Sequence, residues 1–200
     1  MGRFFDADNW VWKPFGWVAD IFMLSLLWFL CSFPLFTLGA ATTALYDAAV
    51  HGLRRGEKDT LGRFFRTFKA EFKTATLSAL LWAAILGLCY LALRLYGNHV
   101  AVTDLSVVIT VAGLVVLAVI VGFLCWVFPL LSRFTFDFGG LNGTTVKVAL
   151  AHLPATMAVG VVTVPAAFLC LQFWVPFFFL PCLLVLFWSL FMEPVFQTYM

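Results

Sequence analysis

Long apolar runs, separated by short polar breaks, follow one another along almost the whole chain. The clearest are residues 75–95, 105–131, 148–170 and 177–191, and each can reach most or all of the way across a hydrocarbon layer of about 30 Å. Because lipid offers the backbone no hydrogen-bond partners, such segments are expected to be helical. The pattern therefore predicts an all-α protein, a polytopic transmembrane helical bundle that forms one integral membrane domain over residues 1–200.

The first apolar region, residues 15–53, is too long for a single span. Its 39 residues would form a helix of about 58 Å, nearly twice the hydrocarbon thickness. Near its middle, Pro34 removes a backbone donor and Gly39 loosens the chain. We therefore predict a helical hairpin with segments at about 15–33 and 35–53, which gives six membrane segments. A single long kinked helix would give five.

Positive charge is concentrated after the second of these segments. Seven of the 12 Lys and Arg residues lie in one stretch, and such a stretch is expected to face the cytoplasm. With six segments, both termini also face the cytoplasm, so we predict a multi-pass plasma-membrane protein with loop 54–73 and the C-terminus inside. With five segments, the N-terminus would lie outside. The seven residues are Arg54, Arg55, Lys58, Arg63, Arg66, Lys69 and Lys73.

The basic stretch also has helical periodicity. After Thr60, a candidate N-cap, five apolar residues recur at helical spacing, while basic residues occupy other faces. The pattern predicts a basic amphipathic helix over 60–73 that lies on the cytoplasmic surface of the membrane. This helix either grips anionic lipid, at roughly 1 kcal/mol per basic residue, or docks to another protein. The candidate docking residues are Arg63, Phe64, Arg66, Phe68, Lys69 and Lys73.

Composition supports the lipid environment and narrows the chemistry. The chain is 64% hydrophobic and 11% charged, with a mean hydropathy of +1.03, whereas a soluble domain carries roughly a quarter charged residues. A net charge of +2 does not indicate a nucleic-acid partner. The sequence contains no GxxxxGK[ST], HExxH or GxSxG motif, and its five cysteines include no CxxC pair. We therefore expect the bilayer as a partner, no nucleic acid, no cofactor or metal, and no enzymatic activity.

Polar residues within apolar segments are the remaining candidates for function, because an ionisable group in lipid costs roughly 2.5–3.5 kcal/mol on insertion scales. Asp47 and His51 are four residues apart and share a helix face. They form either a proton relay or, as we favour, a structural ion-pair cluster. Three threonines nearby lie among Gly and Ala and either pack closely, as we favour, or line a polar path. The candidate intramembrane polar residues are Thr37, Thr42, Thr43, Asp47 and His51.

Two runs resemble a known family. They are FPLFTLGAATTALY at residues 33–46 and FFRTFKAEFK at residues 64–73. Together with the opening of the chain, they resemble the YesL-like bacterial integral membrane proteins, and the resemblance extends over essentially the whole chain. The function of that family is unknown, and its genes tend to lie beside binding-protein-dependent sugar ABC transporters and glycoside hydrolases. The resemblance implies a bacterial cell-membrane protein associated with carbohydrate transport, and it implies no catalytic residues.

These observations lead to three functional hypotheses. The first is a non-enzymatic accessory or regulatory membrane protein of a carbohydrate ABC uptake system, which contacts permease or ATPase subunits through the helix at 60–73. The second is an autonomous small-solute transporter or channel, whose path follows residues 37–43 and the pair Asp47 and His51. The third is a membrane sensor that signals to a regulator.

Overall fold

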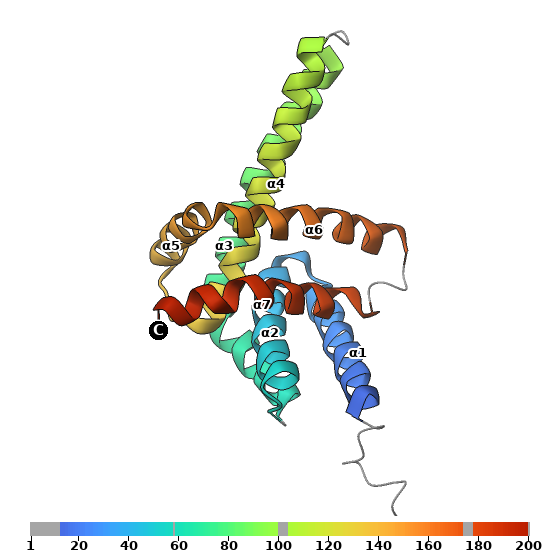
Figure 1. Ribbon diagram of the computed structural model, residues 1–200, viewed down its shortest axis with the longest axis vertical. Coiled ribbons are helices and arrows are strands. Elements are labelled where there is room, and N and C mark those ends of the chain that lie inside the picture. Colours follow the sequence, from blue (N-terminus) through green and yellow to red (C-terminus); the bar gives the residue numbers. More distant parts are fainter. Residues whose placement is uncertain (1–12, 58, 100–103, 174–177, 200) are drawn as a thin grey trace, which may run out of the picture.

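The computed structural model describes residues 13–57, 59–99, 104–173 and 178–199, and all regular secondary structure in these ranges is helical (Figure 1). The predicted all-α class is confirmed. Four of the described helices are long and apolar enough to cross a membrane. α1 has a shorter apolar stretch, Gly16–Ser32. The elements are α1 (Lys13–Ser32), η1 (Leu35–Thr37), α2 (Leu38–Ala49), η2 (Val50–Arg54), α3 (Thr60–His99), α4 (Asp104–Arg133), α5 (Phe138–Ala151), α6 (Leu153–Gln172) and α7 (Leu180–Tyr199).

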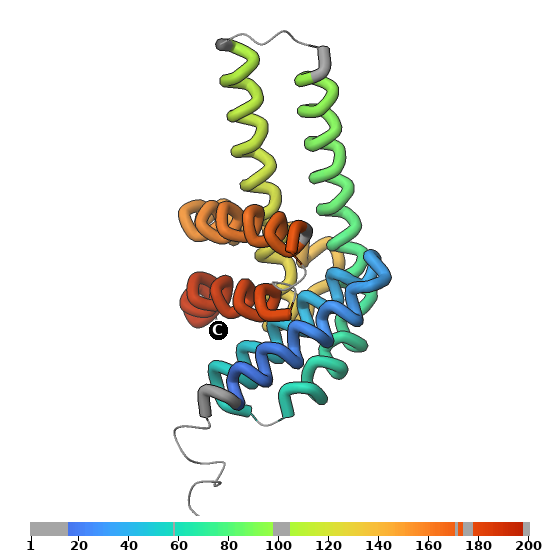
Figure 2. The backbone as a smooth tube through the Cα atoms, turned by 90° about the vertical axis from the view of Figure 1, so that its right-hand side faces the viewer, coloured from blue at the N-terminus to red at the C-terminus, as the bar shows by residue number. Residues whose placement is uncertain are grey.

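The first two helices form a hairpin, as the tube in Figure 2 shows. α1 ends at Ser32, just before Pro34, which has no N–H to continue a helix. The short 3-10 turn that follows is closed by the Thr37 hydroxyl, which donates to the Pro34 carbonyl at 2.6 Å. Across the hairpin, the Trp28 indole donates to the Thr42 hydroxyl at 3.1 Å. Of the two arrangements predicted for residues 15–53, the structure contains the hairpin.

α2 is the central helix of the bundle. Every residue from Gly39 to Ala49 is buried, and the helix contacts α1, α3, α4 and α7. The small residues of α2 allow its neighbours to pack this closely. At Gly39, for example, an added Cβ would lie only 2.5 Å from the carbonyl oxygen of Ala75 on α3. The predicted segment at 35–53 corresponds to η1, α2 and η2, which follow one another without a break from Leu35 to Arg54. Its central part, α2, is enclosed by other helices, because its small side chains allow neighbouring backbones to approach closely.

α3 is one continuous helix of 40 residues, about 60 Å long. The sequence predicted two elements here, a surface helix at 60–73 and a separate segment at 75–95. That separation is wrong, because no Pro or Gly lies between the two parts and the helical hydrogen bonding continues through them. Phe64, Phe68 and Phe72 follow one another along one face of the first part, and this face packs on the protein's own core.

α3 and α4 form a long antiparallel pair whose far half projects beyond the other helices (Figures 1 and 2). Large apolar side chains on this half, such as Leu88 and Val108, are exposed. α6 and α7 lie across the pair rather than along it (Figure 1). The four apolar helices therefore do not share one direction, and the number of membrane crossings stays a prediction.

The last two predicted segments have different bounds in the structure. The segment at 148–170 is interrupted at His152, between α5 and α6. Pro154 explains the break, because it cannot donate to the carbonyl four residues earlier and its ring clashes with that turn. The segment at 177–191 corresponds to α7, which continues to Tyr199. The additional residues include Glu193, which lies beside Arg133 at the end of α4.

Candidate functional site

Charged side chains from five elements meet in the bundle, at the end where α4 terminates. α2 supplies Asp47, η2 supplies His51, α3 supplies Arg63, α4 supplies Arg133 and α7 supplies Glu193. Asp47, His51 and Glu193 are 5%, 6% and 8% exposed. Buried charges require partners, because taking an ion out of water costs several kcal/mol.

Asp47 joins α2 to η2 and α3. Its Oδ2 accepts from Arg63 Nε at 3.0 Å and from the Thr67 hydroxyl at 2.7 Å, and its Oδ1 lies 3.0 Å from His51 Nδ1. Arg63 also donates from Nη1 to Glu57 at 2.6 Å. The carboxylate of Asp47 is therefore fully engaged, and it holds the basic part of α3 against the central helix.

Glu193 joins α7 to α4 and α2. Its Oε1 accepts from Arg133 Nη2 at 2.6 Å and Nε at 3.0 Å, and from the Tyr46 hydroxyl at 3.3 Å. Arg55 Nη2 lies 3.7 Å from the other carboxylate oxygen. One helical turn earlier on α7, Ser189 accepts from Arg54 through its carbonyl and hydroxyl oxygens, each at 3.0 Å.

His51 connects these two groups of side chains. Its Nε2 lies 3.2 Å from Arg55 Nη1 and 3.2 Å from Arg133 Nη1. A guanidinium can only donate hydrogen bonds, so Nε2 accepts and the proton of the neutral ring resides on Nδ1, facing Asp47. Each ring nitrogen thus contacts charged side chains of the network, Asp47 on one side and two arginines on the other. Arg54 and Arg55 of the basic stretch also take part, since Arg54 binds Ser189 and Arg55 contacts His51.

The three threonines of the predicted polar path donate to nearby backbone carbonyls. Thr37 donates to Pro34, Thr42 donates to Leu38 at 2.7 Å, and Thr43 donates to Gly39 at 3.0 Å. Hydroxyls that are satisfied in this way allow a polar residue to lie within a closely packed helix. Their geometry suits the packing interpretation, while passage of a solute along them stays a prediction.

The predicted docking residues divide into two sets. Phe64 is fully buried, Phe68 packs against the core, and Arg63 is bound to Asp47. The prediction that Phe64 faces a partner is wrong, because its side of α3 covers α2, while Arg63 and Phe68 are partly covered by the same packing. Arg66, Lys69 and Lys73 are exposed instead. Among the described residues, Lys69 and Lys73 form no salt bridge, and Arg66 lies 3.6 Å from the exposed Asp59.

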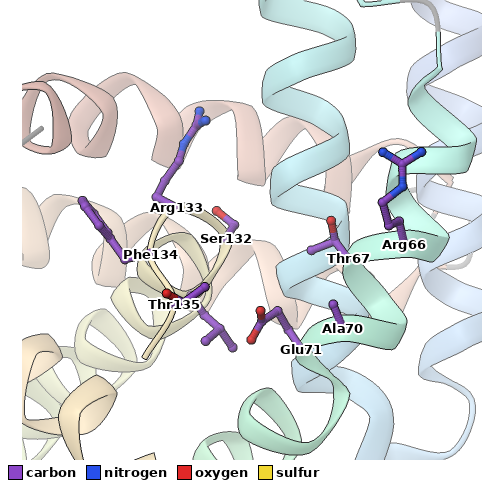
Figure 3. A pocket seen from close by; sticks show the side chains of 9 residues that line it. Arg66, Thr67, Ala70, Glu71, Ser132, Arg133, Phe134 and Thr135 are labelled. Carbon is purple, nitrogen blue, oxygen red and sulfur yellow. The ribbon is translucent and has the colours of Figure 1, made fainter. Parts of the chain in front are cut away.

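Two cavities lie near the network. The first, about 250 Å³, is between α3 and the end of α4 (Figure 3). The second, about 390 Å³, is a mainly apolar space between α4, α5 and α7, with Lys147 and Thr144 in its wall. Neither is lined by Asp47 or His51. In the described ranges, no three His, Cys, Asp or Glu side chains lie together in a way that could hold a metal ion.

Arg133 and Glu193 belong to the network but are not among the candidate site residues predicted from the sequence. Each lies at the end of an apolar run, and they are 60 residues apart. Their positions in the sequence carry a signal for the pair. A single basic residue ends one apolar run and a single acidic residue ends another, and each needs an opposite charge if it is buried.

Comparison with known proteins adds one family match. Residues 21–93 match a family described as "Protein of unknown function, DUF624". The matched region covers most of α1, all of α2 and most of α3, and therefore includes Asp47, His51 and Arg63. No curated protein and no solved structure gives a significant match to the chain.

Proposed function

We propose that this protein is a non-enzymatic accessory or regulatory subunit of a carbohydrate ABC importer in the bacterial plasma membrane. The observation that carries the proposal is the exposed basic face of α3, formed by Arg66, Lys69 and Lys73. Exposed positive charge on such a surface favours association with an acidic surface of another protein.

The side of α3 opposite its basic face packs against the rest of the bundle. Phe64 and Phe68 stack at a centroid distance of 6.2 Å, and the bond between Arg63 and Asp47 ties the same helix to α2. A face that is already ordered loses little conformational freedom on binding, which leaves more of the interaction energy for affinity. By the positive-inside rule this end of α3 faces the cytoplasm, where ATPase subunits and permease loops are accessible.

The choice of partner rests on resemblance. The chain resembles the YesL-like bacterial membrane proteins, whose genes tend to lie beside sugar ABC transporters, and the matched family over residues 21–93 is itself of unknown function. Absence of an ATP-binding loop in the sequence is in keeping with a protein that relies on a partner for energy.

The test is a pull-down of tagged protein from native membranes in mild detergent, with mass spectrometry of what remains bound. We expect the wild type to retain an ABC permease and its ATPase in near-equal amounts. The variant K69E/K73E should retain about tenfold less, equivalent to about 1.4 kcal/mol. The control R94E/K147E changes net charge equally at exposed sites away from this face and should bind as the wild type does.

Either of two results would overturn the accessory role: recovery of the wild-type protein alone, or unchanged recovery of both subunits with K69E/K73E. In the first case, autonomous transport becomes the better proposal. Solute flux in liposomes, compared between the wild type and the variants D47A and T42A, would then test it.

A further inference from the structure

The cavity between α3 and the end of α4 combines both signs of charge with hydroxyl groups (Figure 3). Arg66 provides a guanidinium and Glu71 a carboxylate from α3, while Ser132 and Thr135 provide hydroxyls from the opposite wall. Leu131 and Phe134 add apolar surface beside these groups. A small ligand that carries a positive and a negative group would find a counterpart for each.

Glu71 is the least satisfied group in this cavity. Within the part of the chain that the structure describes, its carboxylate forms no hydrogen bond or salt bridge, although the side chain is half-buried. Figure 3 shows the carboxylate pointing toward the α4 wall. A carboxylate that is partly removed from water without a partner is unfavourable, so a cation here would be stabilising. Arg133 does not provide one, since it points away from Glu71 and binds Glu193.

Arg66 is available to bind an anion. Its only described salt bridge, to Asp59 at 3.6 Å, joins two side chains that are 76% and 73% exposed. Exposed pairs of this kind contribute little, so the guanidinium can turn to another anion at small cost. Glu71 lies five positions after Arg66 on α3, which places it about 7.5 Å further along the helix axis and about 140° around it. Arg66 must therefore turn from its position in Figure 3 to share a ligand with Glu71.

The cavity lies where lipid headgroups are expected. Glu71 is four residues, or about 6 Å, from Ala75, where the apolar part of α3 begins. Ser132 directly follows the apolar run of α4. Because the headgroup layer is roughly 5–8 Å thick on each side of the hydrocarbon core, both walls present their polar groups at that depth.

We propose that this cavity binds the headgroup of an amine-bearing phospholipid of the phosphatidylethanolamine class, with Arg66 on the phosphate and Glu71 on the primary ammonium. A primary ammonium has three N–H donors, which suits the Glu71 carboxylate and the hydroxyls of Ser132 and Thr135. The quaternary ammonium of phosphatidylcholine has no donor, and the headgroup of phosphatidylglycerol has no positive charge. The cavity should therefore distinguish these three lipids. The inference does not rest on the proposed partner, whose test changes Lys69 and Lys73 instead.

Native mass spectrometry of the full-length protein, with each of the three lipids added to the detergent-solubilised sample, tests the proposal. We expect phosphatidylethanolamine to bind about tenfold more tightly than the other two lipids. E71Q should abolish this preference, and R66Q should weaken phosphatidylethanolamine binding about tenfold. D137N is the control for E71Q and K69Q is the control for R66Q, because each removes the same charge at an exposed site outside the cavity. Both controls should retain the preference for phosphatidylethanolamine.

The assignment is overturned if the wild-type protein shows no preference among the lipids, or if E71Q keeps the preference. The wild-type comparison needs no variant, so it stands even where a variant fails to fold. Competition with soluble phosphoethanolamine shows whether the cavity binds a lipid or a free solute with the same polar groups. We expect it not to displace phosphatidylethanolamine at equal concentration, because it lacks acyl chains, and displacement would overturn the lipid assignment.

Discussion

Arg133 on α4 and Glu193 on α7 form a buried ion pair, in which two guanidinium nitrogens lie 2.6 and 3.0 Å from one carboxylate oxygen. Their side chains are 6% and 11% exposed. The Tyr46 hydroxyl also donates to Glu193, and His51 accepts from Arg133, so the pair joins the ends of two long helices to the central part of the bundle. We therefore expect the stability of the fold to depend on these few charged residues.

Removing one member of this pair should be strongly destabilising. R133Q leaves the Glu193 carboxylate buried without its main partner, and we expect the free energy of unfolding to fall by about 3–5 kcal/mol. The double variant R133M/E193L removes both charges and should recover most of that loss. Unfolding in a denaturing detergent, followed by tryptophan fluorescence, measures both effects. An R133Q protein that unfolds at the same detergent fraction as the wild type would contradict the structural role of the pair.

Asp47 should control the local stability of η2 and of the first turns of α3. D47N removes a charge that faces His51 and Arg63, so both segments should open more often. We expect faster hydrogen exchange in Val50–Arg54 and at the start of α3, measured by mass spectrometry. D59N is the matched control, because Asp59 is exposed and its salt bridge to Arg66 is weak. Equal exchange in D47N and D59N would show that Asp47 does not hold these segments.

Close helix contacts predict which glycines tolerate a larger side chain. A Cβ on Gly160 of α6 would collide with the backbone oxygen of Ala118 on α4, whereas nothing lies within 4 Å of a Cβ on Gly87. G160L should therefore lower stability by about 1–3 kcal/mol or more, through forced separation of α4 and α6. G87L should fold as the wild type does. Thermal unfolding in detergent compares the two, and equal midpoints would rule out the tight crossing.

The α3 and α4 pair should place its two ends on opposite sides of the membrane. In a protein without its native cysteines, G97C lies near the far end of the pair and G143C lies on α5, near the charged end, and both positions have open space. We expect a membrane-impermeant thiol reagent to label G97C in intact cells and G143C only after the cells are opened. Labelling of both positions in intact cells would contradict the predicted orientation.

Part of the polar cluster is predictable from the sequence. Asp47 and His51 are four residues apart, and helical periodicity alone puts them on one face. Their connection to Arg133 and Glu193 depends on how α4 and α7 cross η2, which no local pattern encodes. The basic part of α3 shows the same limit, since Phe64 and Phe65 are adjacent in an apolar pattern, yet Phe64 is fully buried and Phe65 is 45% exposed.

Composition and hydrophobic pattern predict an all-α membrane protein, a break in the first apolar region at Pro34 and a basic segment before the apolar part of α3. These properties follow from composition, from the need to satisfy backbone hydrogen bonds in lipid, and from one residue without an N–H. The packing of the helices is needed to see that α2 is enclosed, that α3 is continuous, and that Glu193 pairs with Arg133. Lipid and protein core are both apolar, so hydrophobic periodicity does not distinguish a side chain that faces one from a side chain that faces the other.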